Sequence, residues 1–121
     1  MFNNRRSSFR ISLPLKKPDF LKERLVIAID KFEDEPKVHI VDQGQYLGDF
    51  SEDDAVSEIL TLGYLEERAR FFLAYARNFG CSAVDQISGE VIADNWDLSE
   101  IVPEDVWFNL ESQWGSLLTR G

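Results

Sequence analysis

The stretch from residue 51 to residue 80 constrains the fold most, because its apolar residues follow a helical spacing that changes phase once. The first apolar stripe, continued at helical spacing, runs into Gly63 and then into charged residues. A second stripe begins at Leu65 and recurs at intervals of four, three, four and three residues. We therefore predict two helices, over 52–62 and 64–79, with a single kinked helix as the alternative. The first stripe comprises Ala55, Val56, Ile59, Leu60 and Leu62, and the second comprises Leu65, Ala69, Phe72, Ala76 and Phe79.

Residue types at the ends of these helices support the boundaries. Ser51 stands three residues before Asp54, which matches a capping box with Asp in place of the usual Glu or Gln. Three acidic residues follow Ser51, where carboxylates complement the positive end of the helix dipole. Gly63 and Gly80 follow the two stripes, and glycine in a left-handed conformation commonly ends a helix.

The second helix carries another row at helical spacing. It comprises Tyr64, Arg68, Phe71 and Tyr75. This row either widens the face that packs on a sheet or forms an aromatic and basic contact surface for a partner.

Three apolar stretches before the helical pair predict an antiparallel meander. Residues 24–32 are β-branched and almost continuously apolar, which is typical of a buried strand. The acidic turn 33–36 separates them from a strand at 37–41, and Gln43-Gly44-Gln45 leads to a third strand at 46–50.

Weaker signals flank this central part. Residues 8–13 alternate apolar and polar residues and predict an edge strand, which prolines at 14 and 18 end. Residues 82–87 and 90–93 flank Ser88-Gly89, which predicts a two-residue hairpin. Pro103 suits the first turn of a last helix. The apolar stripe of that helix comprises Trp107, Leu110, Trp114, Leu117 and Leu118.

These elements predict one α+β domain over residues 1–121. We expect an antiparallel sheet of four to six strands, built from a meander plus a hairpin, with the central helical pair and the C-terminal helix covering one face. Residues 1–7 are expected to form a mobile basic N-terminal arm.

Charge is unevenly distributed along the chain, whose net charge is −9. Residues 1–24 hold seven basic and two acidic side chains, a net charge of +5, and the remaining residues therefore carry −14. A basic arm is thus attached to an acidic body, and charge of this kind governs association rather than fold. Because the body repels polyanions, we expect the arm at residues 5–24 to pack on protein rather than on nucleic acid, although contact with phosphates through the arm remains an alternative.

The sequence lacks the residues that several kinds of chemistry require. No apolar run approaches membrane-spanning length, and a single cysteine, Cys81, favours a reducing cytoplasmic setting. The single histidine, His39, has no second histidine or cysteine pair with which to build a zinc site, so we interpret it as structural. Residues 94–100 lack the glycine of a calcium loop, and no nucleophile elbow, phosphate loop or dinucleotide fingerprint is present. We therefore expect no cofactor, no metal and no catalytic residue.

Acidic residues gather in three clusters, which we interpret either as ordinary solubilising charge or as a surface for a basic partner. The clusters comprise Asp30, Glu33, Asp34 and Glu35; then Asp49, Glu52, Asp53 and Asp54; then Asp94, Asp97, Glu100, Glu104 and Asp105. Our leading hypothesis is a small, non-catalytic interaction protein of the inhibitor, immunity or antitoxin type, which binds a basic, nucleic-acid-handling protein by charge complementarity.

Two alternatives remain open. A structural subunit or adaptor could form homo-oligomers through aromatic helix faces, with Trp107, Trp114, Phe71 and Tyr75 as anchors. An enzyme could use a carboxylate cluster, which would require a concave pocket lined by several acids.

Overall fold

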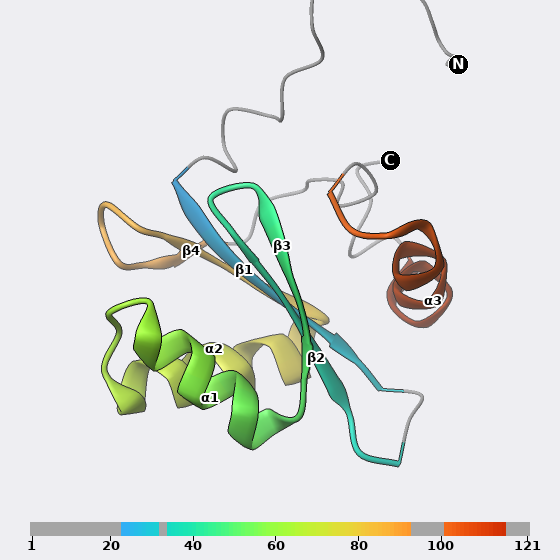
Figure 1. Ribbon diagram of the computed structural model, residues 1–121, viewed down its shortest axis with the longest axis horizontal. Coiled ribbons are helices and arrows are strands. Elements are labelled where there is room, and N and C mark those ends of the chain that lie inside the picture. Colours follow the sequence, from blue (N-terminus) through green and yellow to red (C-terminus); the bar gives the residue numbers. More distant parts are fainter. Residues whose placement is uncertain (1–22, 32–33, 93–100, 116–121) are drawn as a thin grey trace, which may run out of the picture.

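Figure 1 shows the computed structural model, which describes residues 23–31, 34–92 and 101–115. In this part of the chain, five strands form one antiparallel sheet in the order β3-β2-β1-β4-β5. The strands are β1 (Arg24–Asp30), β2 (Lys37–Asp42), β3 (Gln45–Phe50), β4 (Cys81–Asp85) and β5 (Val91–Ile92), and the helices are α1 (Glu52–Thr61), α2 (Glu66–Phe79) and α3 (Glu104–Trp114). The α+β class, the meander β1-β2-β3 and the separate helical pair are confirmed.

The helices cover both faces of the sheet, so the expectation that all of them share one face is wrong (Figure 1). Alternate residues of the central strand β1 explain this arrangement, because successive strand side chains point to opposite faces. Leu25, Ile27 and Ile29 pack with α1 and α2, whereas Val26 and Ala28 pack with Leu110 of α3. The nearly continuous apolar sequence of β1 therefore serves two cores, one on each side of the sheet.

Both ends of α1 and the turn that leads to α2 follow the prediction closely. The Ser51 hydroxyl caps α1 by accepting a hydrogen bond from the Asp54 amide at 3.2 Å. Gly63 has a φ of +103° just after α1 ends, which an L side chain rarely adopts. The chain then begins α2 at Glu66, and two helices rather than one kinked helix result.

The buried side of α2 differs from the predicted stripe at both ends. Leu65 is 67% exposed because it precedes the helix in an extended conformation, so helical spacing does not apply to it. Phe79, the last helical residue, is 51% exposed. The residues of α2 that are buried are Ala69, Phe72, Leu73 and Ala76.

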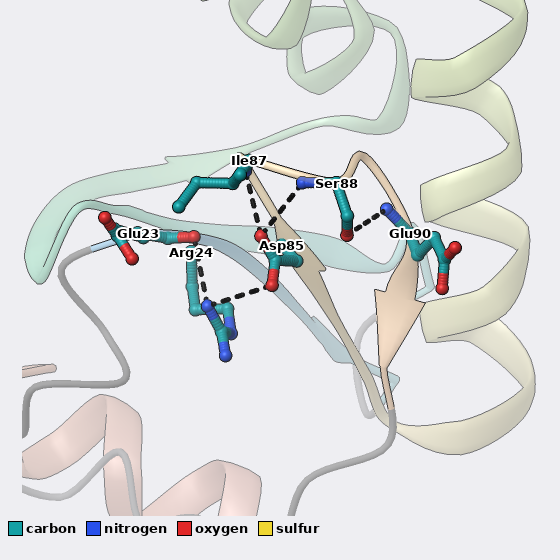
Figure 2. Close-up of polar contacts among 6 residues, drawn as sticks. All are labelled: Glu23, Arg24, Asp85, Ile87, Ser88 and Glu90. Carbon is teal, nitrogen blue, oxygen red and sulfur yellow. Dashed lines mark hydrogen bonds and ion pairs between the residues drawn. The ribbon is translucent and has the colours of Figure 1, made fainter.

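The hairpin between β4 and β5 has a longer turn than the predicted two-residue loop at Ser88-Gly89. Val84 pairs with Val91, and the Asp85 amide donates to the Glu90 carbonyl, so four residues lie between Asp85 and Glu90. Figure 2 shows the cause: the Asp85 carboxylate accepts hydrogen bonds from the amides of Ile87 and Ser88 at 2.8 and 3.1 Å. An Asp that binds amides two and three residues further on starts a turn at its own position. This carboxylate also faces the Arg24 guanidinium at 3.5 Å.

The end of α3 is fixed to the end of β1. The Trp114 indole Nε1 donates to the Ile29 carbonyl at 2.6 Å, and the Gln113 amide donates to Asp30 Oδ1 at 2.6 Å. The Trp114 ring lies against Gly80, where an added Cβ would come within 2.7 Å of it. The Lys31 ammonium lies 4.0 Å from the ring centroid of the same tryptophan.

Some predictions fall outside the described residues. These are the strand at 8–13, the arm at 1–7, and the last two leucines of the C-terminal stripe. Within the described residues, no helix is long and apolar enough to cross a membrane.

Candidate functional site

Two of the acidic clusters come together at one end of the sheet. Val38 at the start of β2 pairs with Phe50 at the end of β3. This antiparallel register places the turn before β2 beside the first turn of α1, which begins directly after β3. Residues 34–36 and residues 49–54 therefore lie side by side, although they are separated in sequence by two strands.

The two segments enclose an open hollow, which we call the acidic hollow. Its larger part has a volume of about 450 Å³, and an adjoining part has a volume of about 280 Å³. The acidic residues that line the two parts are Asp34, Glu35, Asp49, Glu52, Asp53 and Asp54, together with Pro36, Lys37, Phe50 and Ser51. Six carboxylates and one ammonium give the lining a net charge of −5.

Only part of this negative charge is compensated within the molecule. Lys37 Nζ lies 3.4 Å from Asp49, and Arg77 of α2 donates to Glu52 at 2.6 Å. Within the described part of the chain, the other four acids (Asp34, Glu35, Asp53 and Asp54) form no ion pair, and all four are exposed. The hollow therefore presents solvated carboxylates that an incoming cationic group can reach.

The positive end of the α1 dipole offsets part of the repulsion among these carboxylates. Carboxylates in the first turn of a helix interact favourably with its positive end, each by about 0.3–1 kcal/mol. Glu52, Asp53 and Asp54 occupy that turn, which the Ser51 hydroxyl caps. The regular helix therefore fixes the backbone positions from which these three side chains extend.

The remaining acidic residues lie elsewhere or are not described. Glu104 and Asp105 stand in the first turn of α3, on the opposite face of the sheet. Asp30 is buried and bonded to Gln113, so it does not contribute to the hollow. Glu33, Asp94, Asp97 and Glu100 fall outside the described residues.

The row Tyr64, Arg68, Phe71 and Tyr75 is split between the core and the surface. Tyr64 packs edge-on against the buried Phe72, with ring centroids 5.3 Å apart. Arg68 donates to the Gly89 carbonyl at 2.5 Å and lies over the ring of Phe71. Phe71 is 48% exposed, and Tyr75 packs against Phe79 with centroids 4.7 Å apart.

The tryptophans proposed as oligomerisation anchors pack within the molecule. Trp107 and Trp114 are partly buried against the second core, beside Val26 and Ala28. Of the four proposed anchors, Phe71 is exposed, whereas Tyr75 is partly buried like the two tryptophans.

His39 and Tyr46 form a polar pair under the α3 side of the sheet. His39 Nδ1 and the Tyr46 hydroxyl are 3.0 Å apart, and His39 is 4% exposed. Burial lowers the pKa of His39 below 6.5, although the carboxylates of Asp30 and Asp49 oppose this shift. Burial also raises the pKa of Tyr46 to about 12, with Asp49 and Asp105 adding to the rise. Both side chains are therefore uncharged at neutral pH, as the structural interpretation of His39 requires.

Cys81 is poorly suited to act as a nucleophile. Burial raises the pKa of the Cys81 thiol to about 12, so it stays protonated at neutral pH and is a poor nucleophile. Among residues 23–31, 34–92 and 101–115, no group of three or more His, Cys, Asp or Glu side chains is arranged to hold a metal ion.

Comparison of the chain with protein-family models, with curated proteins and with solved structures finds no match. The physical character of the acidic hollow is therefore the basis for a functional proposal.

Convergence of the two clusters was left open by the sequence analysis, yet a signal for it was present. In an antiparallel meander, the start of the second strand and the end of the third lie at the same edge of the sheet. The predicted meander therefore implies that the turn at 33–36 and the helix start at 51–54 lie close together. What the sequence did not indicate is that the two segments leave a hollow between them.

Proposed function

We propose that this protein is a non-catalytic binding protein whose acidic hollow captures a basic surface on another protein. The observation that carries the proposal is the gathering of six carboxylates around two adjoining concavities, each lined by four of them. Four of the six have no ion-pair partner in the described structure. A lysine or arginine side chain entering the hollow would meet several carboxylates at once, and arginine could bind one in a bidentate manner.

Charge of this kind acts mainly on the rate and selectivity of association. A concentrated potential steers an oppositely charged partner and repels acidic proteins, and its effect weakens as salt screens it. Basic surfaces that handle nucleic acid are a suitable class of partner, because carboxylates can stand where phosphates would bind. An inhibitor, immunity or antitoxin role would follow if the captured surface were the partner's own binding site.

The carboxylate-enzyme alternative is less well supported, although the concave acidic pocket that it requires is present. General acid–base catalysis needs a carboxyl group whose surroundings shift its affinity for protons, usually by desolvation. The acids of the hollow are mostly exposed, and neither the buried His39 nor the partly buried Cys81 lines it. These properties favour binding over proton transfer.

A matched pair of triple variants tests the proposal. The first, Asp34→Asn/Glu35→Gln/Asp53→Asn, removes three exposed charges from the hollow. The second, Glu104→Gln/Asp105→Asn/Glu111→Gln, removes three exposed charges from α3 on the other face. Both change the net charge equally, so only the location of the lost charge differs.

The measurement is the amount of each basic protein retained from a lysate of the source cells on immobilised wild-type and variant proteins. We expect the wild type and the α3 variant to retain the same basic partner, and the hollow variant to lose it. Retention should fall steeply when the salt concentration rises from about 0.05 M to about 0.5 M, because the Debye length shrinks below about 5 Å. Equal losses in both variants, or retention that ignores salt, would refute capture by the hollow.

A further inference from the structure

The outward face of α2 carries a short seam with two apolar residues at its centre and a polar residue at each end. Opposite the buried row of this helix, Glu67, Phe71, Ala74 and Asn78 recur at intervals of four, three and four residues. Residues at this spacing lie along one side of a helix. Phe71 is 48% exposed at the middle of the seam, and Phe79 beside it is 51% exposed.

The aromatic side chains beside the seam are already ordered. Phe71 and Tyr75 have ring centroids 6.4 Å apart, and Tyr75 and Phe79 have centroids 4.7 Å apart. Arg68, held by the Gly89 carbonyl at 2.5 Å, lies over Phe71 with 5.4 Å between its guanidinium carbon and the ring centroid. Because these side chains hold one another in place, a partner would lose little conformational entropy by packing on them.

Charge on α2 differs from charge on the rest of the chain. The helix carries Glu66 and Glu67 against Arg68, Arg70 and Arg77, which gives it a net charge of +1 in a protein of net charge −9. Two copies that meet at α2 therefore avoid most of the mutual repulsion that their acidic surfaces would cause. This charge balance favours a second copy over an oppositely charged protein as the occupant of the seam.

The order of residues along the seam also suits a two-fold symmetric contact. In such a contact, the same patch faces itself, so large side chains must meet small ones from the other copy. Two antiparallel α2 helices, related by an axis between residues 72 and 73, place Phe71 opposite Ala74 of the second copy. The same arrangement places Glu67 opposite Asn78 of the second copy, at both ends of the seam.

We propose that a second copy of this chain docks on the α2 seam, with the two α2 helices antiparallel across a two-fold axis. The proposal does not rest on capture of a basic partner, since the acidic hollow is formed by other segments. Phe71 and Phe79 would together remove about 200 Å² of apolar surface from water per copy, if each buries its exposed half out of the roughly 150–250 Å² of an aromatic side chain. That area is small beside the roughly 800 Å² per partner of a standard interface, so we expect a weak dimer that forms only at high protein concentration.

Sedimentation velocity of the full chain over a dilution series tests this proposal, with a matched pair of substitutions. Phe71→Glu should abolish the concentration-dependent shift of the sedimentation coefficient. Phe108→Glu should not, because Phe108 is a 68% exposed phenylalanine on α3, on the opposite face of the sheet. Circular dichroism checks that both variants keep their helix content.

Substitutions at Asn78 test the antiparallel register and remain informative if Phe71→Glu fails to fold. Asn78 is exposed and three turns from Glu67, so the two residues do not interact within one copy. Asn78→Lys should tighten the dimer and Asn78→Glu should weaken it, each by about fivefold, because two symmetric contacts with Glu67 are changed. A strictly monomeric wild type up to about 1 mM, equal effects of Phe71→Glu and Phe108→Glu, or equal effects of the two Asn78 variants would overturn the proposal.

Discussion

Replacing Gly80 with alanine should destabilise the protein through two separable effects. The φ of Gly80 is +87°, and an L side chain in that region costs about 1–2 kcal/mol. The added Cβ would also stand 2.7, 2.8 and 3.0 Å from three ring atoms of Trp114, which is closer than real Cβ contacts allow. The indole must therefore move, and the last turn of α3 must move with it.

The cost of moving Trp114 can be worked from its contacts. The indole would lose its hydrogen bond to the Ile29 carbonyl, which is worth about 1 kcal/mol and leaves a buried acceptor unpaired. Its packing against the second core and its contact with the Lys31 ammonium would weaken as well. We expect Gly80→Ala to lower the free energy of unfolding by about 3 kcal/mol in total, of which roughly half comes from the backbone.

Gly63→Ala is the matched control, because the φ of Gly63 is +103° but no atom lies within 4 Å of the position of its Cβ. Urea unfolding, followed by circular dichroism at one protein concentration, should show a loss of about 1–2 kcal/mol for this variant. In a Trp114→Ala background, the cost of Gly80→Ala should fall to that of Gly63→Ala, since the clash is gone. Equal losses for Gly80→Ala and Gly63→Ala in the wild-type background would refute the reasoning.

Three further predictions concern polar groups in the sheet. The Ser82 hydroxyl is fully buried without a hydrogen-bond partner in the described structure. Ser82→Ala should therefore raise the free energy of unfolding by about 1 kcal/mol in urea titrations. A lower free energy of unfolding in this variant would contradict the prediction. Burial lowers the pKa of His39, so the unfolded chain takes up a proton at a higher pH than the folded protein does. The free energy of unfolding should therefore be constant above pH 6.5 and fall as the pH drops from 6.5 towards the folded-state pKa of His39. In His39→Gln, the free energy of unfolding should stay constant over this pH range. Hydrogen bonds from the Ser88 and Ile87 amides, and also Arg24, lower the pKa of Asp85 against an opposing effect of desolvation. The amides of Ser88 and Ile87 should therefore exchange hydrogen faster in Asp85→Ala. Unchanged exchange would show that the Asp85 carboxylate does not hold the turn.

Short-range signals in the sequence were sufficient to predict the helical pair. The capping hydroxyl of Ser51, the phase change at Gly63 and the end at Gly80 each depend on residues within one or two turns. The length of the β4–β5 turn was predicted wrongly because the side chain of Asp85, rather than the Ser88-Gly89 pair, sets where the turn starts.

The placement of α3 could not be read from its own amphipathic pattern, which does not say which face of the sheet it covers. The better indicator was β1, where Leu25, Val26, Ile27, Ala28 and Ile29 are all apolar. A strand of this kind is buried on both faces and needs a cover on each. Phe71 is exposed because it lies on the side of α2 opposite the buried row, and Phe79 is exposed at the last position of the helix.

The acidic hollow has a consequence for the free protein that is independent of any partner. Folding brings two acidic segments together that the unfolded chain keeps apart, so like-charge repulsion is present in the native state and relieved on unfolding. Counter-ions should therefore stabilise the unbound protein, and a cationic ligand should raise its melting temperature by binding the folded form alone. Thermal stability thus becomes a direct readout with which candidate ligands can be ranked.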